Sequence, residues 1–105
     1  YGGEEFMVIV RKYEEQEIIS LCEEIRVAVM GMKICHEAYE GKYITVSVGL
    51  DLAKKTKKNS YEDMVTNADI ALYCAKDKGR NCVAVYTKGM ESCISNAKRR
   101  DCQCK

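Results

Sequence analysis

The feature that most constrains this chain is its first segment, in which Gly2-Gly3-Glu4-Glu5-Phe6 runs directly into Met7-Val8-Ile9-Val10. Two glycines followed by two carboxylates and an apolar run predict a tight turn that feeds a buried strand. Because glycine has no Cβ, such a turn lets a ligand approach the backbone closely. Glu4 and Glu5 can then hold a divalent metal beside that ligand. For the pentapeptide alone, a glycine hairpin with solvated glutamates is the simpler interpretation.

Length and composition indicate one folded domain. The chain has 105 residues, of which 47% are hydrophobic and 31% are charged, values that fit a folded soluble domain and argue against disorder. No apolar run approaches the ~18 residues of a membrane helix. No basic segment followed by an apolar one marks a signal peptide. We therefore expect a cytoplasmic location and no membrane segment.

The net charge of +1 gives no reason to expect a nucleic-acid partner. The two basic clusters, residues 54–58 and 98–100, are interpreted as a solvated loop and a solvated tail. Seven cysteines are present, and reduced thiols are the default without a secretory signal. Cys102 and Cys104 could form a zinc site with His36 only if they meet in space, and a thiol-bearing tail is the favoured interpretation.

The predicted elements follow the order β-α-(β)-β-α-β. Strands are expected over Phe6 to Tyr13, Tyr43 to Leu50 and Cys82 to Tyr86, with an ambiguous edge strand over Ile34 to Ala38. An amphipathic helix is expected from Glu14 to about Met32. A second helix, opened by Ser60 and stopped by Gly79, carries a narrow stripe of small apolar side chains that permits close packing against a sheet. This order predicts an α+β domain with helices packed on a mostly antiparallel sheet.

A second group of candidate functional residues surrounds the end of that second helix. Lys76 stands in its last turn, and Arg80 follows the glycine stop. Two cations at this place could clamp a triphosphate, arginine as a bidentate fork and lysine as a point charge. In isolation, compensation of the helix dipole is the favoured interpretation of these two residues.

Three blocks in order, GGEEF entering an apolar strand, then ITVSVGL, then ADIALYCAKDKGRNCV, closely resemble the diguanylate cyclase (GGDEF) family. The resemblance covers positions 1 to 86 and includes the Glu variant at the third position of the first motif. It implies a palm-like α+β fold similar to adenylyl cyclases and polymerases. It also implies condensation of two GTP molecules into cyclic di-GMP with release of pyrophosphate, at the interface of a homodimer.

Site roles are carried over by motif position. The resemblance implies that Glu4 binds the catalytic Mg²⁺ (or Mn²⁺) and helps to deprotonate the attacking 3′-hydroxyl, with Glu5 as an auxiliary metal or hydrogen-bonding carboxylate. Gly2 and Gly3 would face the nucleotide. Lys76 and Arg80 would hold its phosphates. Residues 4, 76 and 80 are therefore predicted to converge around one triphosphate pocket.

The resemblance breaks at the beginning of the chain. In the family, a preceding half carries another metal-binding aspartate, the guanine-reading residues and the partner arm of the glycine hairpin. We therefore expect residues 1–88 to be the C-terminal part of a GGDEF domain whose N-terminal half is absent here. Residues 89–105 are expected to be a polar basic tail with room for a short helix near residues 90–98. An upstream sensor or regulatory domain is expected, and the chain alone is expected to be inactive. The alternative is a degenerate GGDEF-type module that binds nucleotide, regulates or dimerises without turnover.

Overall fold

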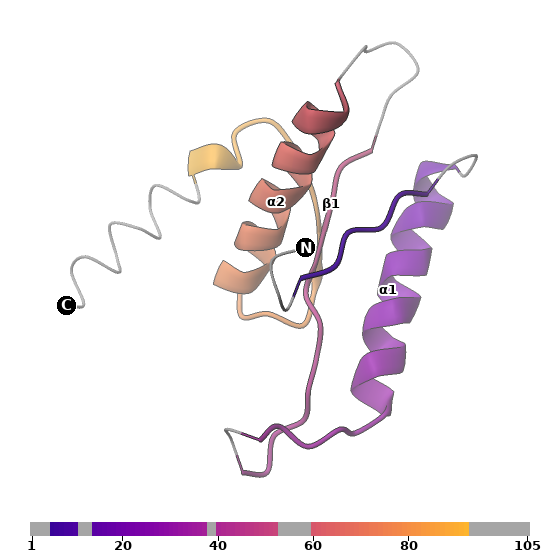
Figure 1. Cartoon of the computed structure of the whole chain (residues 1–105), viewed down its shortest axis with the longest axis vertical. Helices are drawn as coiled ribbons and strands as arrows, with labels where there is room; N and C mark the ends of the chain where they lie inside the picture. The colour runs from indigo at the N-terminus through magenta and orange to yellow at the C-terminus, as the bar shows by residue number, and fades with distance from the viewer. Residues whose placement is uncertain (1–4, 11–13, 38–39, 53–59, 93–105) are drawn as a thin grey trace, which may run out of the picture.

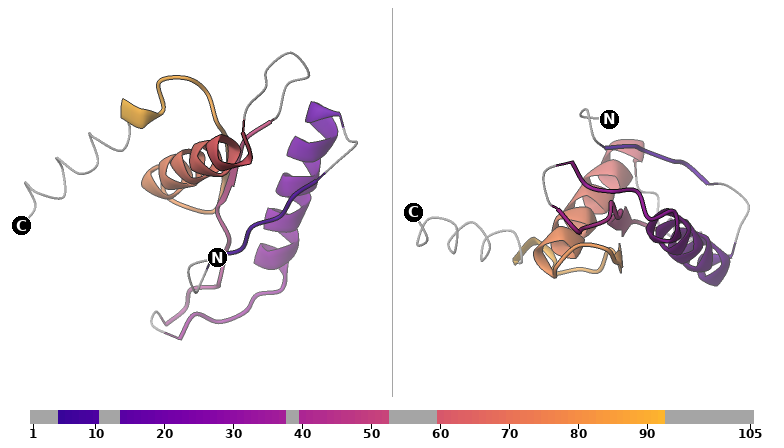
Figure 2. Two further views of the ribbon diagram at one scale, coloured as in Figure 1. Left: turned by 45° about the horizontal axis from the view of Figure 1, so that its top comes forward. Right: turned by 90° about the horizontal axis from the view of Figure 1, so that it is seen from below.

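The computed structural model of the chain describes residues 5–10, 14–37, 40–52 and 60–92. In this part the elements are α1 (Glu15–Gly31), β1 (Val48–Leu50), α2 (Tyr61–Asp77) and β2 (Val83–Val85). The two strands form a small sheet with α1 on one side and α2 on the other (Figures 1 and 2). No helix within the described ranges combines the length and the apolar character needed to cross a membrane.

The sheet is parallel, so the predicted mostly antiparallel sheet is not found in the described part. Val48 pairs with Val83 and Leu50 with Val85, and the ladder closes with Val48 N–H donating to Cys82 O over 2.9 Å. The reason is the connection between the strands. The long helix α2 carries the chain back to the starting edge of β1, so β2 must run in the same direction.

Antiparallel pairing occurs at one bridge among the described residues, between Cys35 and Tyr43. His36 N–H donates to Lys42 O (2.8 Å) and Ile44 N–H donates to Ile34 O (2.7 Å). Of the ambiguous strand predicted over residues 34–38, the described part forms only this bridge, through Cys35. The strand predicted over residues 43–50 is divided between the bridge at Tyr43 and the parallel ladder of β1.

The strand predicted over residues 6–13 is not formed by its described part, residues 6–10. A strand is defined by its hydrogen-bonded neighbour, and apolar β-branched character alone does not provide one. The apolar side chains here are largely solvent-exposed, as Phe6 (89% exposed) illustrates. Residues 5–10 run as an extended segment between the C-terminal end of α2 and the start of α1 (Figure 1).

The helix prediction for the first half of the chain is confirmed to within one residue at each end, because α1 spans Glu15–Gly31. Its acidic first turn, with Glu15 and Glu17, suits the positive end of the helix dipole. No residue of α1 is buried, although its apolar side chains recur at helical spacing. Polar contacts, described below, therefore contribute to its attachment.

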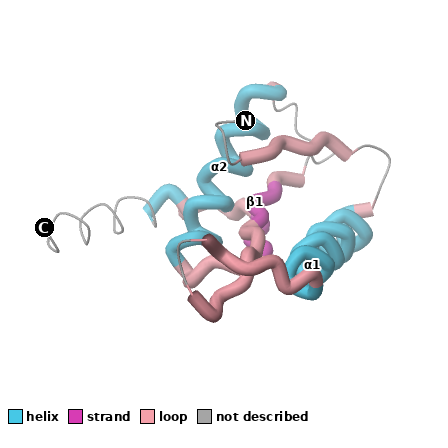
Figure 3. Tube along the Cα trace, turned by 60° about the horizontal axis from the view of Figure 1, so that its bottom comes forward, coloured by secondary structure: helices cyan, strands magenta, loops and turns pink. Residues whose placement is uncertain are grey.

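The second helix is also confirmed, and it contains the core. Ser60 Oγ accepts a hydrogen bond from Asp63 N–H (3.1 Å), which is the predicted N-terminal cap. The buried side chains are small, namely Ala71, Cys74 and Ala75 on α2 and Ala84 on β2. Figure 3 shows β1 passing between the two helices.

The closest contact in this core is made by Gly49 of β1. A Cβ built at Gly49 would overlap Leu72 N and Ala68 O and would lie 2.5 Å from Leu72 Cα. The backbones of β1 and α2 therefore touch with no side chain between them, as the stripe of small residues predicts. Nearby, Asn67 Nδ2 of α2 donates to Asp51 Oδ2 just after β1 (3.1 Å).

The chain after β2 returns to the core within the described range. Met90 packs against the cluster of Ala71, Ala75 and Ala84, and its carbonyl accepts a weak bond from Cys74 Sγ (3.6 Å). The short helix predicted near residues 90–98 begins at residue 91, and its continuation lies outside the described residues. The predicted division of the chain after residue 88 stays a prediction.

We expect Gly49→Ala to destabilise the fold by about 2–3 kcal/mol or more, because the added methyl group meets backbone that cannot move aside easily. For a domain of this size, each 1 kcal/mol corresponds to about 4–8 °C in the melting temperature. Thermal unfolding followed by circular dichroism measures this loss. Gly31→Ala is the matched control, because a Cβ at Gly31 meets nothing within 4 Å; an equal loss in both variants would contradict the packing argument.

Candidate functional site

The C-terminal end of α2 holds Lys76, and its backbone is closely defined. Gly79 N–H donates to Lys76 O (3.3 Å) and Arg80 N–H donates to Ala75 O (3.1 Å). With Lys78 as the cap and Gly79 at a φ of +119°, these two bonds form the Schellman arrangement. The predicted glycine stop is therefore confirmed, and the same bonds fix the backbone nitrogen of Arg80 against the helix.

Glu5 of the first motif lies beside this helix end. Glu5 Oε2 is 4.0 Å from Lys76 Nζ, and the two side chains are 37% and 38% exposed respectively. Lys76 follows Glu5 by 71 positions in the sequence, so the fold brings Glu5 of the first motif to the helix end that carries Lys76. At this distance and exposure the pair is a weak ionic contact that adds little to folding stability.

Arg80 is exposed in the turn between α2 and β2. Its φ of 66° is in the left-handed region, as is the φ of 49° at Asn81. Two successive residues with side chains rarely adopt this conformation. The turn is therefore held by contacts on both of its sides.

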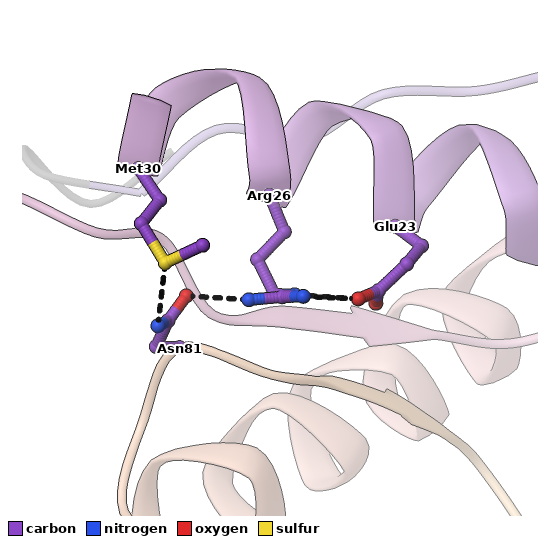
Figure 4. A network of polar contacts seen from close by, with 4 residues as sticks. All are labelled: Glu23, Arg26, Met30 and Asn81. Carbon is purple, nitrogen blue, oxygen red and sulfur yellow. Dashed lines mark hydrogen bonds and ion pairs between the residues drawn. The ribbon is translucent and has the colours of Figure 1, made fainter. Parts of the chain in front are cut away.

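Asn81 makes those contacts on the far side, and the sequence reasoning missed it (Figure 4). Its N–H donates to Ser47 Oγ (3.1 Å). Its side chain accepts from Arg26 Nη1 (3.0 Å) and donates to Met30 Sδ (3.4 Å). The left-handed preference of asparagine after a glycine stop was the available signal.

Arg26 is held in turn by Glu23, one helical turn earlier on α1. Arg26 Nε donates to Glu23 Oε1 (2.9 Å), and Nη2 of the same guanidinium also contacts that oxygen. The hydrogen bonding from Arg26 lowers the pKa of Glu23, and the same contact raises the pKa of Arg26. Both groups are charged at neutral pH, so the guanidinium is available to Asn81.

Three of the predicted site residues, Gly2, Gly3 and Glu4, lie outside the described residues. Among the others, Glu5 lies beside Lys76 and Arg80 lies in the exposed turn that follows α2. The predicted convergence of residues 4, 76 and 80 around one pocket stays a prediction. The described ranges contain no group of three or more His, Cys, Asp or Glu side chains that could hold a metal ion. The cysteines described, Cys22, Cys35, Cys74 and Cys82, form no disulfide bond with one another. The weaker alternative, a zinc site formed with His36, depends on Cys102 and Cys104, which lie outside the described residues. Both basic clusters also lie outside the described residues.

Comparison with known proteins decides the family. Residues 1–82 match the family described as "Diguanylate cyclase, GGDEF domain". The chain belongs to this family. The resemblance stated from the three sequence blocks is therefore confirmed.

Individual relatives agree with the family match. The chain is 35% identical over 86 residues to the diguanylate cyclase DosC of Escherichia coli, covering 82% of this chain and 18% of that protein. It is 34% identical to diguanylate cyclase A of Treponema denticola, covering 81% of this chain and 22% of the relative. Against the response regulator PleD of Caulobacter vibrioides the identity is 34%, over 79% of this chain and 18% of that protein. The chain thus spans about a fifth of the length of these relatives. No solved structure matches the chain.

We expect Lys76→Met to change the free energy of unfolding by less than about 0.5–1 kcal/mol, because an exposed ion pair at 4.0 Å contributes little and methionine retains an apolar stem. Urea unfolding of the chain measures this difference. A much larger loss would show that Lys76 is a structural residue, and its interpretation as a ligand-binding cation would lose its basis.

Proposed function

We propose that this chain contributes the GGEEF turn and the phosphate-binding cations of a diguanylate cyclase domain, which condenses two GTP molecules into cyclic di-GMP and releases pyrophosphate. The observation that carries the proposal is the approach of Glu5 to Lys76. It supports a common site for an acidic turn and a helix-end cation that are far apart in sequence. Phosphoryl transfer depends on such positioned charges more than on covalent help from the protein.

The acidic turn has the donor chemistry for a hard divalent cation. Glu5 is partly exposed and carries oxygen donors, which Mg²⁺ and Mn²⁺ prefer. We assign Glu4, the adjacent carboxylate, as the principal ligand and as the group that accepts the proton of the 3′-hydroxyl, with Glu5 as its auxiliary. When bound, the metal neutralises charge that develops on the phosphates.

The remaining residues bind the nucleotide. Gly2 and Gly3 permit close approach of the triphosphate to the backbone. Lys76 supplies a point charge from the last turn of α2, and Arg80 supplies a planar fork from the exposed turn that follows. The exposure of both cations supports their availability to an anionic ligand.

Two GTP molecules must meet for this reaction, so the proposal includes a homodimer of complete domains with one nucleotide on each. It also includes an upstream sensor or regulatory domain, since the relatives are roughly four to five times as long as the chain. The 105-residue chain alone supplies one acidic turn and two cations, which is too little for a two-metal site. We therefore propose that it is inactive by itself.

An assay of the isolated chain with GTP and Mg²⁺ or Mn²⁺ is expected to give no measurable cyclic di-GMP, with chromatography of the nucleotides as the measurement. The full-length protein that carries this segment is expected to form product and to lose about a hundredfold or more of its rate on Glu4→Ala, because a metal ligand is removed. Product from the isolated chain that disappears on Glu4→Ala would overturn the requirement for a complete domain. Full activity of the full-length Glu4→Ala variant would overturn the assigned role of Glu4.

A second candidate function is a degenerate GGDEF-type module that regulates, binds nucleotide or dimerises without turnover. The exposed apolar side chains of residues 6–9 and the absence of buried residues on α1 favour a docking role. Gel filtration during a GTP titration separates the two functions. Dimerisation that is indifferent to nucleotide, with no product formed by the full-length protein, would favour the module.

A further inference from the structure

The turn that carries Arg80 is fixed at both of its ends by different kinds of contact. On the α2 side, backbone bonds from Gly79 and Arg80 close the helix. On the β2 side, Asn81 contacts Ser47 just before β1. Its side chain also contacts Arg26 and Met30 on α1 (Figure 4). One asparagine therefore connects three segments that are separate in sequence.

We propose that Asn81 is a positioning residue, which sets the direction in which Arg80 projects and so couples α1 to the phosphate-binding turn. The inference rests on the proposed role of Arg80 as a phosphate-binding residue. Asn81 itself does not touch the nucleotide in this proposal and acts through the backbone of its neighbour.

The left-handed backbone of the turn supports this role of Asn81. Arg80 and Asn81 have φ values of 66° and 49°, and left-handed conformations of residues with side chains persist only where the surroundings hold them. Asparagine tolerates this conformation, whereas arginine gains nothing from it. The contacts of Asn81 therefore stabilise a conformation that Arg80 would otherwise leave.

The fixed position of Arg26, which donates to Asn81, also supports this role. The Arg26 side chain is only 16% exposed and is held by Glu23 on the same helix. A guanidinium fixed in this way is a precise donor to Asn81 Oδ1, because little rotational freedom remains to be lost. A displacement of α1 would consequently be transmitted to the turn, and a small displacement of a charged group is enough to change nucleotide binding strongly.

Two variants of Asn81 and one control variant of Asn67 test the contacts that Asn81 makes. Asn81→Gly removes both side-chain bonds but keeps the N–H that donates to Ser47 Oγ, and glycine accepts a φ of 49° without strain. Asn81→Asp keeps an oxygen acceptor for Arg26. Asn67→Ala is the matched control, since it also removes a 3.1 Å side-chain bond of an asparagine, at a place far along α2 from the Arg80 turn.

In the full-length protein, we expect Asn81→Gly to raise the KM for GTP about tenfold, Asn81→Asp to stay within about twofold of the unchanged protein, and Asn67→Ala to leave KM unchanged. The decisive measurement is the double variant. Because Asn81 acts through Arg80, Asn81→Gly should add no further increase in KM to Arg80→Ala. A purely structural role would instead add the same factor in both backgrounds and would overturn the proposal.

The phosphate-binding role of Arg80 and the positioning role of Asn81 are overturned by different results. If Arg80→Ala leaves KM unchanged, the phosphate-binding role of Arg80 is wrong and the positioning role falls with it. If Arg80→Ala raises KM but Asn81→Gly does not, the positioning role alone is overturned.

A second measurement uses the 105-residue chain and needs no activity. Arg26→Met removes the donor to Asn81 Oδ1, so the turn should become more accessible and trypsin should cleave the bond after Arg80 several-fold faster than in Asn67→Ala. Mass spectrometry of early digestion products gives the rate at this single bond. Equal rates in the two variants would show that Arg26 and Asn81 do not hold the turn.

Discussion

The direct contact between the backbone of β1 at Gly49 and the backbone of α2 sets the position of everything that follows it. Because no side chain lies between them, β1 and α2 pack at the single distance at which their backbones touch. The small residues Ala71 and Ala75 on α2 and Ala84 on β2 are the side chains that this separation admits to the core. The axis of α2 is thereby fixed, and so are the places where its two ends project from the sheet. The positions of Lys76 and Arg80, at the end of α2 and just after it, therefore depend on this contact.

The polar attachment of α1 complements this apolar core. None of the α1 side chains is buried, so apolar burial alone gives this helix a weak orientation. The bonds that Arg26 and Met30 make to Asn81 attach it at one defined point, directly after the exposed turn at Arg80. The architecture thus combines a rigid unit of β1, α2 and β2 with a helix joined to it near the candidate site.

Local signals in the sequence were sufficient for both helices, for the cap at Ser60, for the stop at Gly79 and for the family. The helices, the cap and the stop could be predicted because each depends on residues a few positions apart: a side chain that accepts from the first turn, or a glycine that reverses the chain. The family could be recognised because its three motifs occur in order along the chain. The strand directions could not be obtained in this way. Parallel pairing of residues 48–50 with residues 83–85 depends on where α2 delivers the chain, and the apolar pattern of residues 6–10 does not specify a neighbour. Asn81 was missed for the same reason, since its partners on α1 and before β1 are distant in sequence. The family resemblance predicted that residues 4, 76 and 80 converge, whereas the approach of Glu5 to Lys76 is seen in the structure alone.

The weakness of the contact between Glu5 and Lys76 bears on how such a site can work. A close, buried ion pair would have to be broken before a triphosphate could use the lysine, and separating it would reduce the binding energy available to the ligand. At 4.0 Å, with more than a third of each side chain exposed, both groups instead remain largely hydrated and little is lost when their partners change. In the proposed function, a nucleotide with its divalent ion would offer phosphate oxygens to the lysine and a cation to the carboxylate, so both charges would be compensated in the complex. The fold therefore determines where the two groups lie in the free protein, and their mutual attraction adds little.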